Sequence, residues 1–191
     1  MAKRINSRNK GSRMERKAAE LLKKWTSYDF TRVPSSGGLR WKKTDNITGD
    51  IVCADERHKC LLSFEIKARA TIDFSKLVTP HHNSEIYEFW EQCKNDAERG
   101  FKIPLLMFRN NGLSPSNFFF IAMEAKHFRQ LYPHMSRNPN YYYIKCFGKH
   151  KIVIFHPNLL LDTPYMNIHK VLVKIFKKQW PKRYESLTYG L

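Results

Sequence analysis

Two continuous apolar runs in the middle of the chain restrict its fold most. They are IPLLMF (103–108) and NFFFIAM (117–123), separated by the turn-forming stretch NNGLSPS. Neither run alternates between apolar and polar residues, so each predicts a strand that is buried on both faces. Such strands need helices on both sides of their sheet. The sequence therefore predicts an α/β fold with a mixed central sheet flanked by helices.

Two amphipathic segments supply these helices. In GSRMERKAAELLKKW (11–25), apolar residues recur every three or four positions and share one helical face. SEIYEFWEQCKNDAERG (84–100) has the same period, begins with the capping residue Ser84 and ends at Gly100. Between them, YDFTRV, GDIVCA and CLLSFEIKAR predict strands, and the last two are expected to form a hairpin.

The 191 residues suit one domain with two appendages. Residues 1–10 are polar and basic and are expected to form an N-terminal arm. Residues 11–123 carry the core, and residues 124–191 are expected to form a C-terminal extension packed on it. In that extension we expect a short helix at 124–132, strands near 141–147 and 151–156, and a basic helix from about 162 to 178.

The charge of the chain is strongly positive. Lys and Arg number 34 against 17 Asp and Glu, a formal net charge of +17. A field of this sign attracts polyanions, so nucleic acid is the expected partner; a membrane surface or no such partner are the alternatives. No window approaches the roughly 18 apolar residues of a spanning helix, and the N-terminus lacks the apolar core of a signal peptide. A cytoplasmic protein without a membrane partner is expected.

The strand-like stretch LLSFEIKAR (61–69) carries unexpected charges. Side chains alternate across a strand, so Phe64 and Ile66 face one side while Glu65 and Lys67 face the other. Burying a carboxylate and an ammonium together is costly unless something compensates, and a divalent cation is one such compensation. An exposed cross-strand pair, worth a few tenths of a kcal/mol, is the alternative.

A second acid strengthens the case for a metal. The predicted hairpin brings Asp50, at the start of GDIVCA, close to Glu65. Two neighbouring carboxylates repel each other unless a cation lies between them, and Mg²⁺ prefers such oxygen ligands. Asp50 and Glu65 are therefore candidate metal ligands, with the backbone carbonyl of Ile66 as a third. Lys67 is placed to orient a water for attack on phosphorus and to stabilise the developing charge, as phosphodiester hydrolysis requires.

These residues resemble the PD-(D/E)xK nuclease superfamily, and in particular its archaeal-type Holliday-junction resolvase branch. The resemblance rests on Asp50 followed by Glu65-Ile66-Lys67, on KGSRMERKAAELL and TRVPSSGG before them, and on Gln92 and GFKIPLLMF after them. It covers about residues 10–123. The proline that commonly precedes the aspartate is Gly49 here, and the C-terminal third has no counterpart.

The resemblance implies a restriction-endonuclease-like core in which Asp50 and Glu65 bind Mg²⁺, with Mn²⁺ as a substitute and no small-molecule cofactor. It also implies that Lys67 assists the attacking water, and that Glu15 contacts the metal site directly or through water. The expected activity is endonucleolytic cleavage of branched DNA by a homodimer, in DNA recombination. The residues expected to contact DNA are Arg32, Ser35, Ser36, Lys42, Lys43, Arg69 and Gln92.

The sequence leaves three alternatives open, one for the role of Glu15 and two for the function. Glu15 follows Ser12 by three positions, so the two residues can also form a capping box at the start of a helix. The same core can belong to a restriction-like or repair nuclease with another DNA preference. A non-catalytic, basic DNA-binding module is the third possibility, and it predicts salt-sensitive binding without cleavage.

Overall fold

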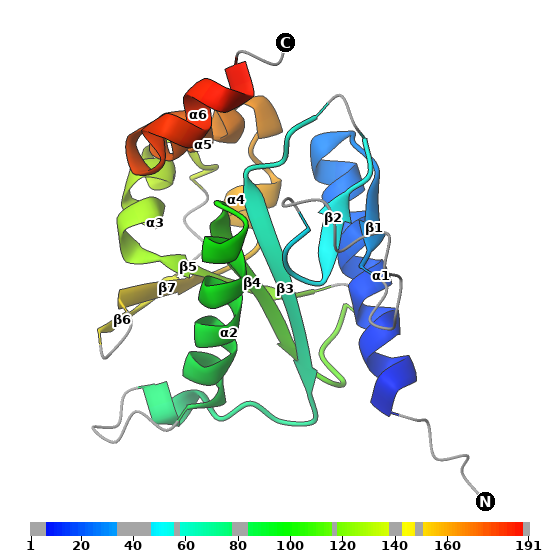
Figure 1. Cartoon of the computed structure of the whole chain (residues 1–191). Coiled ribbons are helices and arrows are strands. Elements are labelled where there is room, and N and C mark those ends of the chain that lie inside the picture. The colour runs from blue at the N-terminus through cyan, green and yellow to red at the C-terminus, as the bar shows by residue number, and fades with distance from the viewer. Residues whose placement is uncertain are drawn as a thin grey trace, which may run out of the picture.

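A mixed β-sheet forms the centre of the molecule in a computed structural model (Figure 1). The structure describes residues 7–33, 47–55, 58–77, 84–115, 118–137, 143–147 and 151–188. Within these ranges seven strands form one sheet in the order β1-β2-β3-β4-β5-β7-β6. The strands are β1 (Phe30–Arg32), β2 (Ile51–Cys53), β3 (Leu62–Arg69), β4 (Ile103–Asn110), β5 (Phe120–Glu124), β6 (Tyr143–Phe147) and β7 (Lys151–Phe155).

Strand β4 lies in the middle of the sheet and is buried from Ile103 to Arg109. It pairs in parallel with β3 and antiparallel with β5, whereas the other neighbouring strands pair antiparallel. Helix α2 (Glu85–Arg99) makes the crossover between the parallel strands β3 and β4. Ser84 caps this helix by accepting a hydrogen bond from the N–H of Ile86 at 3.2 Å, as the sequence predicts.

Helices cover both faces of the sheet, and Figure 1 shows α2 in front of β3 and β4. On one face, α1 (Ser7–Thr26), α3 (Ala125–Leu131) and α5 (Tyr165–Gln179) share a hydrophobic core with Phe64 and Ile66 of β3. On the other face, α2 packs on Leu106 and Phe108 of β4. The prediction of a mixed sheet flanked by helices is confirmed.

The segments after residue 124 extend the same sheet and core. Strand β7 pairs with β5, and β6 forms the far edge. The expected helix, strands and basic helix form as α3, β6, β7 and α5. The sequence pattern did not predict α4 (Asn158–Leu161) or α6 (Pro181–Thr188). In the described part of the chain, no helix is long and apolar enough to cross a membrane.

Helix α1 begins earlier than its apolar pattern indicates. It starts at Ser7 rather than Gly11, so residues 7–10 of the expected arm are helical, while residues 1–6 lie outside the described residues. Periodicity marks only the part of a helix that packs on a core, whereas its backbone can continue into a polar turn. Ser12 therefore lies inside the helix and cannot cap it. The capping-box interpretation of Ser12 and Glu15 is wrong.

Candidate active site

Asp50 lies immediately before β2, and its backbone is fixed on both sides. Its N–H donates a hydrogen bond to the carbonyl of Phe64 at 2.8 Å, and its carbonyl accepts one from the N–H of Val33 at 2.9 Å. Its carboxylate oxygen Oδ2 accepts a hydrogen bond from the N–H of Ile66 at 2.8 Å. The register between β2 and β3 pairs Ile51 with Phe64. Two residues further along β3, the N–H of Ile66 therefore donates to the Asp50 carboxylate rather than to a backbone carbonyl.

Gly49 makes this placement of Asp50 possible. Its φ is +76°, and a Cβ at this position would lie 2.3 Å from the carbonyl oxygen of Phe64. Proline fixes φ near −65° and cannot adopt this conformation. Glycine, in place of the proline that is common at this position, therefore occurs where the backbone approaches β3 closely.

Glu65 and Lys67 lie together on the face of β3 that α2 covers. Glu65 is 1% exposed, and Lys67 Nζ lies 2.6 Å from its oxygen Oε1. Lys67 Nζ is 6.0 Å from the centre of the Phe89 ring on α2. The alternation predicted for this strand is confirmed, and the alternative of an exposed cross-strand pair is wrong.

The two carboxylates have raised pKa values. Burial raises the pKa of Glu65 to about 7, and the nearby charge of Asp50 adds to this effect against the opposing charge of Lys67. Burial also raises the pKa of Asp50, although the N–H of Ile66 and the charge of Lys67 lower it. The charge of Asp50 therefore disfavours ionisation of Glu65. A cation between them would relieve that repulsion.

Glu15 projects toward this region from α1. Its oxygen Oε2 accepts a hydrogen bond from Nε of Arg32 on β1, and the two form an ion pair. Its charge is also among those that raise the pKa of Asp50. The structure thus brings Glu15, Arg32 and Asp50 into one neighbourhood.

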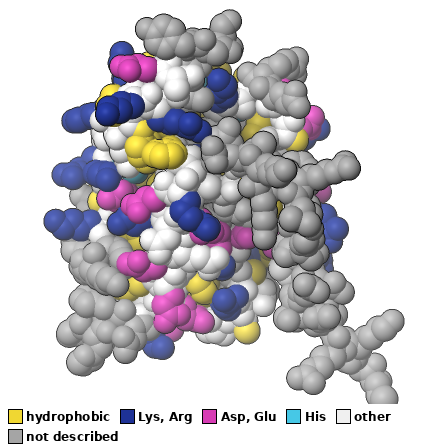
Figure 2. Space-filling model, viewed as in Figure 1, with side chains coloured by type: hydrophobic (Ala, Val, Ile, Leu, Met, Phe, Trp, Pro, Cys, Tyr) yellow, Lys and Arg dark blue, Asp and Glu magenta, His cyan; other side chains and the backbone are white. Residues whose placement is uncertain are grey.

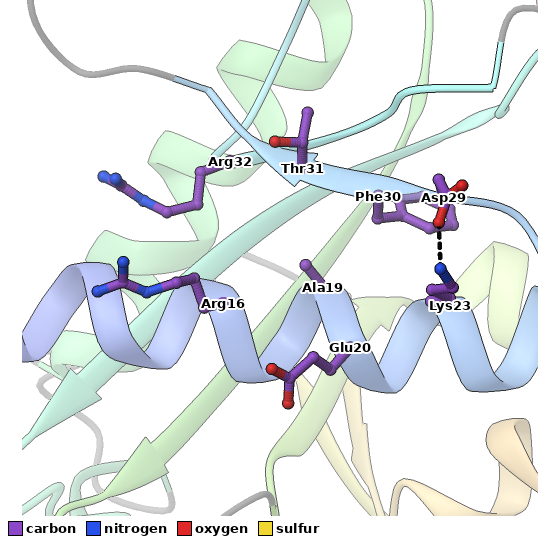
Figure 3. A pocket seen from close by; sticks show the side chains of 8 residues that line it. All are labelled: Arg16, Ala19, Glu20, Lys23, Asp29, Phe30, Thr31 and Arg32. Atoms are coloured by element: carbon purple, nitrogen blue, oxygen red, sulfur yellow. Dashed lines mark ion pairs between the residues drawn. The ribbon is translucent and has the colours of Figure 1, made fainter.

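A groove extends from Arg32 between α1 and β1 (Figure 3). Its volume is about 500 Å³. Arg16 and Arg32 extend in the same direction at one end, and the ion pair of Lys23 with Asp29, 2.5 Å long, lies at the other. The basic end of the groove is thus the end next to Glu15.

Sequence reasoning missed two residues of this neighbourhood. Asp96 on α2 is among the charges that raise the pKa values of Asp50 and Glu65, and it is paired with Arg99. Asp96 follows Gln92 by four positions, so helical periodicity could have placed both on one face of α2. Arg16 lines the groove and is adjacent in sequence to Glu15.

The other predicted DNA contacts lie farther out or are not described. The guanidinium of Arg69 stacks 4.8 Å from the centre of the Phe89 ring, and its Nε lies 3.8 Å from Glu85 Oε1. Gln92 is exposed on α2. The remaining predicted contacts lie outside the described residues; they are Ser35, Ser36, Lys42 and Lys43.

The donors at the site suit a hard divalent cation. Among the described residues, no group of three or more His, Cys, Asp or Glu side chains forms a metal cluster, so Asp50 and Glu65 stand as a pair of carboxylates. Within the same residues, Oε1 of Glu65 receives no well-directed hydrogen bond, although Lys67 is close. An oxygen pair with an unsaturated acceptor fits Mg²⁺, which keeps several of its waters.

Comparison with known proteins identifies the family of the chain. Protein D14 of Escherichia phage T5 is 27% identical over 108 residues, which cover 56% of this chain and 66% of that protein. No solved structure matches the chain significantly. The protein family described as "Phage putative PDDEXK endonuclease" matches residues 6–182. The chain therefore belongs to this phage family of PD-(D/E)xK endonucleases.

Proposed function

We propose that this protein is a divalent-metal-dependent endodeoxyribonuclease that cuts branched DNA, with Holliday junctions as its substrates. One observation carries the proposal: the Asp50 carboxylate is anchored on the Ile66 N–H, next to a buried Glu65 that is paired with Lys67. Two converging carboxylates and an ammonium are the groups that metal-assisted phosphodiester hydrolysis needs.

In this proposal Asp50 and Glu65 hold Mg²⁺, or Mn²⁺ in its place. The N–H and C=O of a residue in a strand point to the same side, so the Ile66 carbonyl faces the edge of β3 where Asp50 lies. That orientation supports Ile66 as a third oxygen ligand. When bound, the cation polarises a phosphoryl oxygen and lowers the pKa of water.

Lys67 acts on the attacking water and on the phosphate. Its ammonium is half-buried and held beside Glu65, so its direction is fixed before DNA binds. From there it orients the water and donates to the phosphate oxygens as negative charge develops on them. Such donors contribute only when their position is fixed before the reaction. A shortened side chain at this position therefore cannot replace the Lys67 ammonium.

Glu15 and Arg32 position the DNA backbone beside the cut. Arg32 is held by Glu15 and opens onto the basic end of the groove, where Arg16 adds a second guanidinium. Guanidinium groups bind phosphate in a bidentate manner. Two neighbouring arginines therefore support contacts with successive phosphates, and the net charge of +17 supports a wider DNA footprint.

The test compares a labelled four-way junction with a linear duplex at equal concentration, with Mg²⁺ and with EDTA. We expect faster, metal-dependent cleavage of the junction, by symmetric cuts if the active form is a homodimer. Asp50→Asn, Glu65→Gln and Lys67→Ala should each abolish cutting and keep junction binding. Equal rates on both substrates would assign a restriction-like or repair nuclease. Tight, salt-sensitive binding without any cleavage would mean that the protein is a non-catalytic DNA-binding module.

A further inference from the structure

Phe101, two residues after the end of α2, occupies a backbone conformation that bulky residues avoid. Its φ is +51°. The N–H of Phe101 donates to the carbonyl of Glu98 at 3.2 Å, and that of Lys102 donates to Ala97 at 2.9 Å. This is the Schellman arrangement, in which the left-handed position after the helix is usually glycine. Here a phenylalanine holds that position.

The neighbouring glycine cannot take over this role. A Cβ on Gly100 would lie 2.3 Å from Cγ2 of Thr48, so close packing reserves the glycine for the preceding position. Burial does not compensate for the conformation of Phe101, because its side chain remains 41% exposed. Unfavourable backbone conformations of this kind persist at functional sites more often than elsewhere.

Trp180 and Arg183, from the C-terminal helices, lie beside Phe101. The ring of Trp180, at the end of α5, lies edge-on at 6.3 Å, and the guanidinium of Arg183 on α6 lies 5.5 Å from the centre of the Phe101 ring. On the same helices, Lys177 Nζ lies 5.3 Å from the centre of the Tyr184 ring. We name these five residues the aromatic ridge.

The aromatic ridge adjoins the candidate active site. Gly100, next to Phe101, packs on Thr48, which precedes Asp50 by two residues. Asp96, five residues before Phe101, is among the charges that raise the pKa of Asp50. Figure 2 shows a hydrophobic patch bordered by Lys and Arg side chains where Figure 1 places α6 and the end of α2. The contact of Gly100 with Thr48 thus connects the ridge to the segment that carries Asp50.

We propose that the aromatic ridge binds the unpaired bases of a DNA strand that leaves the duplex beside the cut. The proposal rests on the nuclease function above and adds to its substrates branched DNA with a single-stranded segment, which a fully paired Holliday junction lacks. Bases stack on exposed aromatic rings and on guanidinium planes, while lysines neutralise the phosphates. A fully paired duplex hides the faces of its bases, so it offers Phe101 nothing to stack on.

The charge of the surface selects this partner. Arg183 and Lys177 are cationic, and the whole chain carries +17, so a polyanion is complementary where an apolar or basic peptide is not. Stacking tolerates any base sequence. The ridge is therefore expected to recognise the presence of a single strand rather than a sequence motif.

The experiment measures binding of the full chain in EDTA, so that no cleavage occurs. The probes are a labelled blunt duplex and the same duplex with an oligothymidine tail, and the readout is fluorescence anisotropy. The tail should tighten binding by about tenfold in the parent protein. Phe101→Gly should remove most of this gain. In a second measurement, binding of the tail should quench tryptophan fluorescence, and Trp180→Phe should reduce this quenching. Met166→Ala, at a residue that is 52% exposed on α5, should keep the gain.

Phe101→Gly also separates binding from folding. Glycine adopts positive φ without strain, so the thermal midpoint should stay equal or rise while tail binding falls. The proposal is overturned if the tail does not tighten binding, if Phe101→Gly keeps the gain, or if an RNA tail is preferred to DNA. A protein that cuts no DNA yet shows a Phe101-dependent tail effect would refute the nuclease function and keep the ridge. A protein that cuts branched DNA without a tail effect would refute the role of the aromatic ridge and keep the nuclease function.

Discussion

The N–H of Ile66 donates a 2.8 Å hydrogen bond to Oδ2 of Asp50, a side chain on the neighbouring segment. This single contact places a carboxylate beside β3, at the residue next to Glu65 in the chain. It also stabilises the ionised form of Asp50 against the effect of burial. The Asp50 carboxylate is thus held in place by a backbone N–H, whereas Glu65 has a pKa of about 7.

The stability of the metal-free protein should fall as pH rises from about 4.5 to 7. The ordinary pKa of Glu65 is 4.5 and its folded pKa is about 7, so in this window the folded state holds the proton more tightly than the unfolded state. The full loss is at most about 3 kcal/mol. Urea unfolding in EDTA at pH 5 and pH 8 measures it, and Glu65→Gln should flatten this part of the profile. An unchanged pH dependence in Glu65→Gln would contradict the raised pKa.

Mg²⁺ should stabilise the parent protein more at pH 8 than at pH 6. Metal ligation requires ionised Glu65, and that ionisation is complete only above its raised pKa. The increase in thermal midpoint with Mg²⁺ concentration reports the binding. Asp50→Asn and Glu65→Gln should each remove the increase, whereas Glu98→Gln, on the exposed side of α2, should retain it. Equal stabilisation of all four proteins would refute Asp50 and Glu65 as ligands.

Gly49→Ala should reduce both stability and cleavage. Gly49 and Gly112 both have positive φ, but only at Gly49 would a Cβ meet the backbone, 2.3 Å from the Phe64 carbonyl. Gly112→Ala is the matched control and should cost only the conformational strain, about 1–2 kcal/mol. Gly49→Ala should cost more, because β3 or Asp50 must move, and it should weaken Mg²⁺ binding. Chemical denaturation and Mg²⁺ titration of the two variants compare these effects, and similar losses in both would contradict the role of Gly49.

Asp96→Asn should shift the proton release of Glu65 to lower pH. The charge of Asp96 raises the pKa values of Asp50 and Glu65, so its removal makes both easier to ionise. The shift should stay below about one pH unit, because burial is the larger cause. The pH at which Mg²⁺ begins to stabilise the protein measures it. A shift to higher pH would mean that Asp96 acts on the site in another way.

The arrangement of Glu65 and Lys67 could be predicted from the sequence because both residues lie on a strand with strict alternation. Glu65 and Lys67 stand two positions apart, and the hairpin places Asp50 beside them. The pairing of Glu15 with Arg32 could not be read in this way, because it joins a helix to an edge strand, and local periodicity does not encode their separation. The conformation of Phe101 could not be predicted for another reason. Helices commonly end with a glycine in the left-handed conformation, which would be Gly100, but Gly100 packs against Thr48 and the left-handed residue is Phe101, one position later.

The position of Arg16 at the groove likewise has no signal in the sequence pattern. Arg16 and Arg32 reach one end of the groove, where the proposed function requires contacts with DNA phosphates. Arg16→Ala should weaken binding to every DNA by a similar factor and reduce the slope of log K against log salt by about 1. Anisotropy titrations at several salt concentrations measure the slope. Arg13→Ala, exposed on α1 but not lining the groove, is the matched control and should change the slope less. Equal slopes for the two variants would show that the groove does not hold the DNA backbone.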